Sequence, residues 1–527
     1  MKTELPTRMD KCKGAMVATA IGDAMGWPNE LRAKNVKKNP IATDNFIEWS
    51  RRCSKPCWHT EKILPGEYSD DTQLTLSVAR SIISGNWEDQ FAKKELPFWL
   101  TYERGGGGAL LRSARSHKNG VLPWQSKYAA DYFDAGGNGA AMRILPHVIA
   151  NAYSSSLSDL MPVVIRDTFM THGHPRAVLG ATCYAFALDY LLKKESVLEY
   201  GELVDALIES CHIWGALPDS TEFAEWFDCA RVSAHYKYFD EWNHSVNEMI
   251  NQLQYVKSAL KKGVILEDSS VLAKLNCFGK ANGAGDITIL GAVYLASKYA
   301  NNPTLGIKIP AFLIGTDTDT LASITGGLLG MLCGTAWIPA VWRDVQDYEC
   351  LLQITELLLA PNRKEVSKKI VSEAKKNADV WENTPIGWIR KLSAAEYEAG
   401  KDRLISISKY HSALGQTFYI KEYRSVDWNA EEQMLIYAQH GVQSKTGECF
   451  CVENKAAADS DKAYNEFAIN ISNISELLEQ AELKHRTFGK ILQLIRAILL
   501  SGNSAETIAK EFRVDIHVVN TLIKYFK

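Results

Sequence analysis

Two aspartate clusters are the parts of this sequence best suited to chemistry: SDDT at residues 69–72 and DTDT at residues 317–320. Each opens a segment with helical periodicity. Asp, Ser and Thr are common helix caps, so either cluster alone has a purely structural explanation. The second cluster is harder to explain in this way, because residues 320–342 carry no charge and the nearest downstream basic residue is Arg343. Buried carboxylates need a counter-charge, and bound cations would provide it.

The two clusters together predict a binuclear metal site. Their four carboxylates match the charge of two divalent cations, and their hydroxyl groups add neutral oxygen ligands. Oxygen ligands of this kind suit Mg²⁺, or Mn²⁺ as the alternative, better than zinc. Such a site could clamp vicinal hydroxyls of a sugar and orient a water molecule. The predicted ligands are Ser69, Asp70, Asp71, Asp317, Asp319 and Thr320.

Two glycine-rich segments could contact a ligand through their backbone. Residues 105–108 are four glycines in front of a segment with helical periodicity, and N–H groups at such a helix start can hold phosphate oxygens. Residues 137–139, Gly-Asn-Gly, require tight backbone geometry. A glycine run alone does not establish a phosphate site.

The elements that must position these residues are helices. From Lys11 to about Ala360, apolar and small residues recur at three- and four-residue spacing, with no alternation of strands and helices. Residues 320–342 are long enough to span a bilayer. However, Gly326, Gly330 and Gly334 fall on one helix face and permit close helix contact, which favours a buried helix in a soluble bundle.

The rest of the chain predicts smaller units. Residues 1–360 form the predicted all-α domain, 361–400 a linker or peripheral helices, 401–482 a small α+β module, and 483–527 a helix-turn-helix-like end. Strands are expected at 404–410, 416–423, 433–441 and 447–454, and helix caps at Ser504 and Asp515. The last two helices could contact nucleic acid or serve only for packing or dimerisation.

Composition excludes some classes of protein. The 527 residues include 59 Lys and Arg against 62 Asp and Glu, which gives a net charge of −3. This balance argues against a protein devoted to coating nucleic acid, and the 46% hydrophobic content argues against a disordered chain. Eleven cysteines and a polar start predict reduced thiols in a cytoplasmic protein without a membrane partner. Cys53, Cys57 and His59 could ligate zinc, but no fourth ligand follows, so a polar loop is favoured.

Taken in order, several motifs resemble the ADP-ribosylglycohydrolase family over about residues 10–345. They are GDAMG at 22–26 with Glu30, SDDT, GNGAAMRILP at 137–146, Thr171-His172 and GTDTDTLASITGG at 315–327. The resemblance implies an all-α orthogonal helical bundle with two Mg²⁺ ions at the bottom of a cleft for ADP-ribose. Some relatives place an aromatic residue before the GNG motif. This chain does not, which leaves Phe133 as the nearest candidate for an aromatic contact.

The resemblance also assigns roles to residues. It implies a catalytic group of Asp23, Glu30 and Asp317, and it matches the six predicted metal ligands. It implies contacts with ADP-ribose from Gly105, Gly106, Gly107, Gly108, Gly137, Asn138, Gly139, Met142 and His172, although His172 could instead be a capping or core histidine.

The function expected from these residues is hydrolysis of the glycosidic bond between ADP-ribose and a modified target. ADP-ribosylarginine on a protein is favoured by the GNGAAMR form of the motif. ADP-ribosylserine and ADP-ribosylated nucleic acid are alternatives. A non-catalytic ADP-ribose sensor or an immunity protein, with a C-terminal region that binds DNA or a partner, is a rival from another class.

Overall fold

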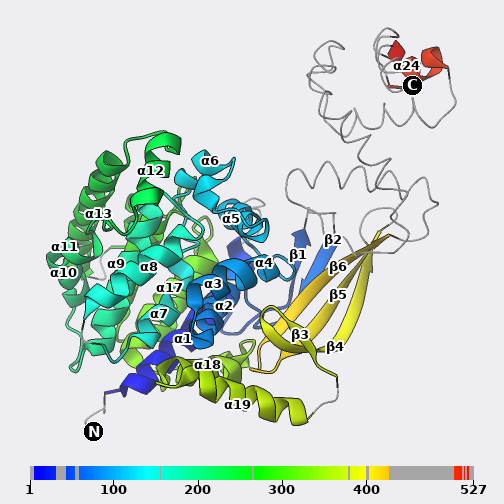
Figure 1. Cartoon of the computed structure of the whole chain (residues 1–527). Coiled ribbons are helices and arrows are strands. Elements are labelled where there is room, and N and C mark those ends of the chain that lie inside the picture. Colours follow the sequence, from blue (N-terminus) through cyan, green and yellow to red (C-terminus); the bar gives the residue numbers. More distant parts are fainter. Residues whose placement is uncertain are drawn as a thin grey trace. The chain divides into compact units, whose positions relative to one another are not determined.

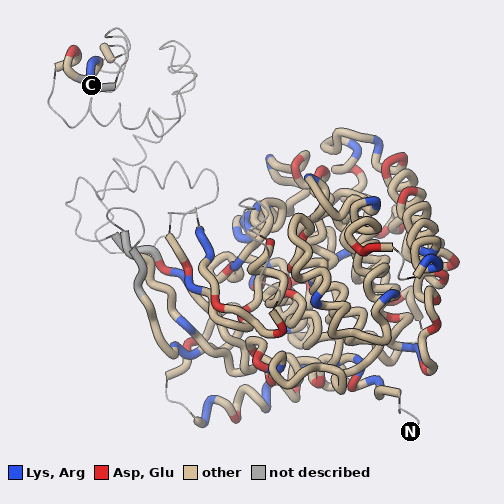
Figure 2. The backbone as a smooth tube through the Cα atoms, turned by 180° about the vertical axis from the view of Figure 1, so that it is seen from behind, with Lys and Arg blue, Asp and Glu red and all other residues tan. Residues whose placement is uncertain are grey.

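The computed structural model describes residues 5–30, 43–53, 59–154, 156–263, 266–377, 380–398, 403–425, 504–512, 516 and 519–520. The chain divides into two compact units, Met1–Ser425 and Val426–Lys527. The first unit contains all the predicted site residues. Acidic and basic residues are interspersed along it (Figure 2), as expected from the near-balanced charge.

The first unit is mainly helical (Figure 1). Its α-helices are α1 (Arg8–Glu30), α2 (Asp70–Ser84), α3 (Trp87–Gln90), α4 (Leu96–Trp99), α5 (Gly108–Lys118), α6 (Ala129–Phe133), α7 (Leu145–Ala150), α8 (Leu157–Phe169), α9 (Pro175–Lys193), α10 (Glu202–Glu209), α11 (Cys211–Trp214), α12 (Ala224–Ser233), α13 (Tyr238–Lys261), α14 (Asp268–Lys274), α15 (Gly285–Lys298), α16 (Pro303–Phe312), α17 (Thr318–Cys333), α18 (Tyr348–Leu359) and α19 (Arg363–Lys376). Short 3₁₀ or π turns are η2 (Phe91–Glu95), η3 (Pro123–Gln125), η4 (Ala141–Arg143) and η6 (Ala340–Asp344). The expectation of a predominantly helical body is confirmed.

Helices α1 and α17 form an antiparallel pair at the centre of this body, and small residues let their backbones touch. A Cβ atom on Gly22 would lie 2.2 Å from the carbonyl oxygen of Ala322, and one on Gly330 would lie 2.2 Å from that of Gly14. The close contact predicted from the glycine spacing is therefore confirmed. Within the described ranges, no helix is both long and apolar enough to cross a membrane.

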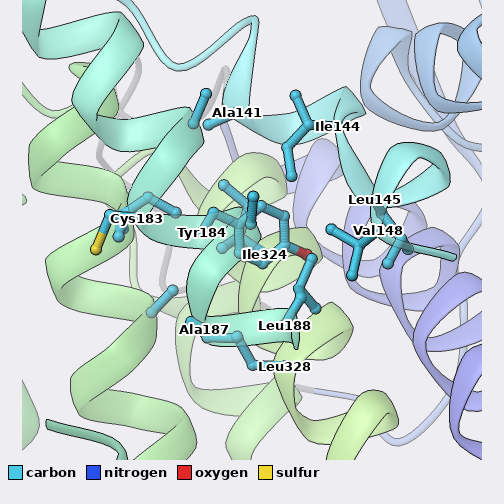
Figure 3. Close-up of a cluster of buried hydrophobic side chains, with 14 of the residues drawn as sticks. Ala141, Ile144, Leu145, Val148, Cys183, Tyr184, Ala187, Leu188, Ile324 and Leu328 are labelled. Carbon is cyan, nitrogen blue, oxygen red and sulfur yellow. The ribbon is translucent and has the colours of Figure 1, made fainter. Parts of the chain in front are cut away.

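The core beside this helix pair is apolar and fully buried. Tyr184 and Leu188 of α9 meet Ile324 and Leu328 of α17 and Val148 of α7 (Figure 3). Each of these side chains is at most 1% exposed. Close packing of this kind holds the starts of the helices, where the aspartates lie, in fixed positions.

Two antiparallel sheets complete the first unit. β1 (Trp49–Cys53) pairs with β2 (His59–Ile63), and the order in the second sheet is β3 (Glu382–Thr384), β4 (Gly387–Glu398), β5 (Arg403–Ser412) and β6 (Thr417–Ser425). The strands expected at 404–410 and 416–423 are confirmed as β5 and β6. The sheet starts earlier than expected, because β3 and β4 lie in the segment 361–400, and the β1–β2 hairpin was not expected. The four-stranded sheet packs on the helical body, where Phe418 meets Tyr102 edge-on at 4.9 Å.

The second unit is described over a short stretch. Helix α24 (Ala505–Phe512) begins after Ser504, whose hydroxyl oxygen accepts a hydrogen bond from the N–H of Thr507 at 3.4 Å. The cap predicted at Ser504 is therefore present. The strands expected at 433–441 and 447–454 and the cap at Asp515 lie outside the described residues, and the helix-turn-helix stays a prediction.

Candidate active site

The start of α2 is held by Asp23 of α1. One carboxylate oxygen of Asp23 accepts the N–H of Ser69 at 3.0 Å. The other accepts the N–H and the hydroxyl of Thr72 at 3.0 and 2.6 Å. The hydroxyl oxygen of Ser69 in turn caps α2 by accepting the N–H of Asp71 at 3.3 Å. These bonds fix the first turn of α2, and with it the carboxylates of Asp70 and Asp71.

The start of α17 meets the start of α2. The hydroxyl of Thr320 donates to Asp71 at 3.3 Å, and its N–H donates to the carboxylate of Asp319 at 2.8 Å. The hydroxyl of Thr318 donates to the carbonyl of Gly26 on α1 at 2.9 Å, so the α1–α17 contact extends to this end. The structure therefore brings together the two aspartate clusters, which are far apart in the sequence.

Glu30, the last residue of α1, joins the same site. Carboxylate oxygens of Glu30, Asp317 and Asp319 lie within 4.8 Å of one another. Asp319 is buried, whereas Glu30 and Asp317 are half-buried. The end of α1 and the start of α17 thus place three carboxylates around one point, two of them only half-buried.

The electrostatics of this cluster favour a bound cation. Burial and the charge of neighbouring carboxylates raise the pKa of Asp70, Asp71 and Asp319 well above the usual range. One buried oxygen of Asp71, Oδ2, has no hydrogen-bond partner among the residues that the structure describes. An unpartnered buried carboxylate oxygen is costly without a counter-charge. The residues therefore fit divalent cations, for which carboxylates and hydroxyls are suitable ligands.

The GNG motif reaches the aspartates through Asn138. The side-chain amide of Asn138 donates to Asp317 at 2.7 Å, and its backbone N–H donates to the carbonyl of Gly283 at 2.9 Å. Gly137 forms an isolated antiparallel bridge with Ala284. The loop that contains Gly283 and Ala284 was not predicted. Its AlaAsnGlyAlaGly composition was the only signal of a tight turn at this place.

His172 lies buried behind the same motif. A Cβ atom on Gly139 would lie 3.0 Å from the imidazole ring and 2.9 Å from the side chain of Leu110, so a side chain at this position would crowd both. The Nδ1 atom of His172 is hydrogen-bonded to the hydroxyl of Thr171 at 2.8 Å. Burial, with a smaller contribution from Arg143, lowers the pKa of His172 to about 3, so its ring is neutral near pH 7. A neutral ring keeps one N–H proton and can orient neighbouring groups, but it does not gain or lose a proton in this pH range.

Residues beside the motif pack inward. The side chain of Met142 is buried in the cluster that contains Trp99 and Tyr102, so a role in ADP-ribose binding would rest on its backbone. Phe133 is fully buried against Tyr132 and Trp226, and it is part of the core. Arg143 was recognised as part of the GNGAAMR motif but was given no role of its own, and Asp167, which lies behind the motif, was not predicted. Arg143 donates to the carbonyl of Gly139 at 2.8 Å and to Asp167 at 2.8 Å.

The glycine loop, defined here as residues 103–108, borders the site at Asp70. Gly105 has a φ of +114°, and a Cβ atom there would lie 2.7 Å from a carboxylate oxygen of Asp70. The N–H groups of Gly105 and Gly106 both donate to the carboxylate of Glu103 at 3.2 Å. Two of the expected phosphate donors are thus bonded to Glu103, whereas Gly107 and Gly108 lie at the start of α5.

Cys53, His59 and Glu61 form a second group whose ligand atoms lie within 4.8 Å of one another. The group lies on the β1–β2 hairpin, where a polar loop was expected. Glu61 is already paired with Arg104 at 2.8 Å and Lys421 at 3.2 Å. These positive charges disfavour a metal cation at this place.

A sequence model of the ADP-ribosylglycohydrolase family matches residues 4–367. The chain belongs to the ADP-ribosylglycohydrolase family. The matched segment contains all the predicted site residues, from Asp23 to Thr320. It ends before β3, so the four-stranded sheet lies outside the part that matches the ADP-ribosylglycohydrolase model.

Individual relatives agree with this membership. ADP-ribosyl-[dinitrogen reductase] glycohydrolase from Rhodospirillum rubrum is 30% identical over 32% of this chain and 54% of its own length. ADP-ribosylarginine hydrolase Tri1 from Serratia proteamaculans is 27% identical over 36% of this chain and 49% of its own. ADP-ribosylhydrolase ARH3 from Xenopus tropicalis is 24% identical over 64% of this chain and 90% of its own. The chain therefore spans about half the length of the first two relatives.

Proposed function

We propose that this chain hydrolyses the glycosidic bond between ADP-ribose and a modified target and releases ADP-ribose. The observation that carries the proposal is the meeting of Asp71 and Thr320 beside Glu30, in a segment that matches the ADP-ribosylglycohydrolase model. ADP-ribosylarginine on a protein is the favoured substrate. The support for it is the GNGAAMR form of the motif and the similarity to a relative named ADP-ribosylarginine hydrolase.

Two Mg²⁺ ions, or Mn²⁺, are proposed as the cofactors. Bound ions would supply positive charge to orient the 2″- and 3″-hydroxyls of the distal ribose and a water molecule. The unpartnered Oδ2 atom of buried Asp71 supports this assignment. The proposed ligands are Ser69, Asp70, Asp71, Asp317, Asp319 and Thr320.

The proposed work of the protein groups is positioning and proton transfer. Asp23 fixes the first turn of α2 through both of its oxygens, and Asn138 orients Asp317 by its hydrogen bond. Asp23 and Asn138 therefore position the proposed metal ligands. Glu30 is the half-buried carboxylate proposed to move a proton, as base toward the attacking water or as acid toward the leaving group. The surrounding carboxylates would stabilise the oxocarbenium-like charge that develops at C1″.

Release of ADP-ribose from a panel of substrates tests this proposal. The panel contains arginine-linked and serine-linked ADP-ribosyl protein and ADP-ribosylated DNA and RNA, each with Mg²⁺ and with chelator. We expect Mg²⁺-dependent release from the arginine-linked member and none from an Asp317→Asn variant. Release from another member would reassign the linkage. If no substrate releases ADP-ribose although the chain binds ADP-ribose, the result would contradict hydrolysis and favour a sensor.

A further inference from the structure

We propose that strand β6, which lies outside the segment matched by the family model, is a working part of the ADP-ribose site. Lys421 and Tyr419 of β6 act as positioning residues that hold the glycine loop against Asp70. This inference rests on the proposed function, because it concerns how the same site binds ADP-ribose. If the inference holds, the four-stranded sheet stabilises the ADP-ribose site.

The first contact is through the backbone. The N–H of Lys421 donates to the carbonyl of Thr101 at 3.0 Å, and its ammonium group donates to the carbonyl of Glu103 at 3.1 Å. One residue of β6 therefore binds the chain both just before the glycine loop and at its first residue. These bonds leave the segment 101–103 little freedom to move.

The second contact is a buried ion network around Arg104. The Arg104 guanidinium is only 2% exposed, pairs with Glu61 at 2.8 Å and Glu67 at 2.9 Å, and lies 3.9 Å from the centre of the Tyr419 ring. Lys421 pairs with Glu61 at 3.2 Å. The ring of Tyr419 thus covers the Arg104 guanidinium, and Lys421 places a second positive charge beside Glu61.

The charges of this network balance only when β6 is present. Glu61, Glu67 and Glu103 bring three negative charges, and Arg51, Arg104 and Lys421 bring three positive ones. The two arginines lie in the segment that matches the family model, and Lys421 does not. Without Lys421 a buried negative charge would lack compensation next to a site that is itself rich in carboxylates.

The network reaches the site through Glu103 and Gly105. The carboxylate of Glu103 accepts the N–H groups of Gly105 and Gly106, and Gly105 approaches Asp70 so closely that no side chain fits between them. Whatever fixes Glu103 therefore fixes the backbone that borders Asp70. Loss of the β6 contacts would loosen this loop, while the starts of α2 and α17 keep their own hydrogen bonds.

The test compares full-length Lys421→Met, Lys421→Arg and Tyr419→Leu with wild type. Lys391→Met is the matched control, the same substitution at an exposed position of the same sheet. Three quantities are measured with Mg²⁺ present: the Kd of ADP-ribose by calorimetry, kcat and KM on ADP-ribosylarginine protein, and the thermal melting temperature. We expect Lys421→Met to raise Kd and KM about tenfold. Its kcat should stay within about twofold of wild type, Lys421→Arg should recover part of the loss, and the control should behave as wild type.

A merely structural role gives a different pattern. It would lower the melting temperature and the apparent kcat, through a smaller folded fraction, with Kd and KM unchanged, and that result overturns the inference. If Lys421→Met does not fold, Tyr419→Leu, which keeps the charge balance, is judged by the same criterion. Wild type that binds ADP-ribose without turnover overturns the proposed hydrolysis, but Kd still decides the role of β6. Wild type without binding overturns both.

Discussion

Asp71 is the residue at which the two halves of the site meet. It lies in the first turn of α2, accepts the hydroxyl of Thr320 from α17, and has a second oxygen without a partner among the described residues. Its charge is therefore a cost to the protein unless a cation is bound. Stability and metal binding should be coupled at this position.

The variant Asp71→Asn tests this coupling. In chelator we expect it to raise the free energy of unfolding by about 1 to 3 kcal/mol, because a buried unpaired carboxylate is replaced by a neutral amide. In Mg²⁺ at a hundred times its Kd, wild type should gain about 2.7 kcal/mol for each ion that it binds, and the variant much less. Urea unfolding with and without Mg²⁺ measures both. Asp159→Asn, an exposed aspartate in the first turn of α8, is the control, and an equal response of Asp71→Asn and wild type to Mg²⁺ would contradict the assignment.

At the scale of elements, the pairing of α1 with α17 sets the geometry of the site. The same contact that brings Gly22 against Ala322 continues to Gly26 and Thr318, and Thr318 lies between Asp317 and Asp319. At the opposite end, Gly330 meets Gly14. The two ends of this helix pair are therefore equally close-packed, but only the end at Gly22 lies beside the candidate active site.

Gly22→Ala and Gly330→Ala separate packing from function. Each adds a methyl group about 2.2 Å from a carbonyl oxygen, so each should destabilise the protein by about 1 to 3 kcal/mol or more. Only Gly22→Ala displaces the start of α2 through its neighbour Asp23, and only it should weaken Mg²⁺ binding. Thermal melting and Mg²⁺ titration compare the two. Equal Mg²⁺ affinity in both variants would count against this link.

Sequence periodicity predicted elements better than it predicted their partners. The glycine spacing in α17 predicted close helix contact, but nothing in the spacing identified α1 as the partner. β5 and β6 were predicted because β-branched and aromatic residues alternate there, as in residues 404–410. β4 was missed because its Lys, Ala and Glu residues favour helix over strand, and tertiary pairing with β5 overrides that preference.

For the site too, the sequence indicated the residues but not their partners in space. The types and order of Asp70, Asp71, Asp317 and Asp319 indicated where chemistry would lie. The sequence could not indicate that both oxygens of Asp23 are bonded to the start of α2, because that depends on how α1 and α2 meet in space. Pairing of the GNG motif with the 283–285 loop was hidden for the same reason: short irregular loops have no periodic signal.

At the scale of the whole molecule, the buried ion network joins the β1–β2 hairpin, the glycine loop and β6. Burial alone would raise the pKa of Glu61, but Arg104, Lys421 and Arg51 outweigh it and hold that pKa at about 2, below the ordinary 4.5. The unfolded chain therefore binds more protons than the folded chain between these values. Stability that is present above pH 4.5 is lost as the pH falls toward 2.

We expect the free energy of unfolding to fall by about 3 kcal/mol across this window because of Glu61. The variant Glu61→Gln should show a flatter curve, since it has no proton to gain at this position. Urea unfolding at a series of pH values from 6 to 2 measures both slopes, with the exposed Glu373→Gln as control. Parallel curves for wild type and Glu61→Gln would show that the network does not hold Glu61 ionised.

The pairing of α1 with α17 also has a consequence for folding during synthesis. About 290 residues separate the end of the first helix from the start of its partner. At a synthesis rate of about 5 to 20 residues per second, the nascent first helix must wait roughly 15 to 60 seconds before α17 is made. During that interval the face of α1 that will contact α17 is uncovered, and the metal site cannot exist. Chaperones that shield nascent chains should therefore engage this protein early and release it only after translation has passed Cys333.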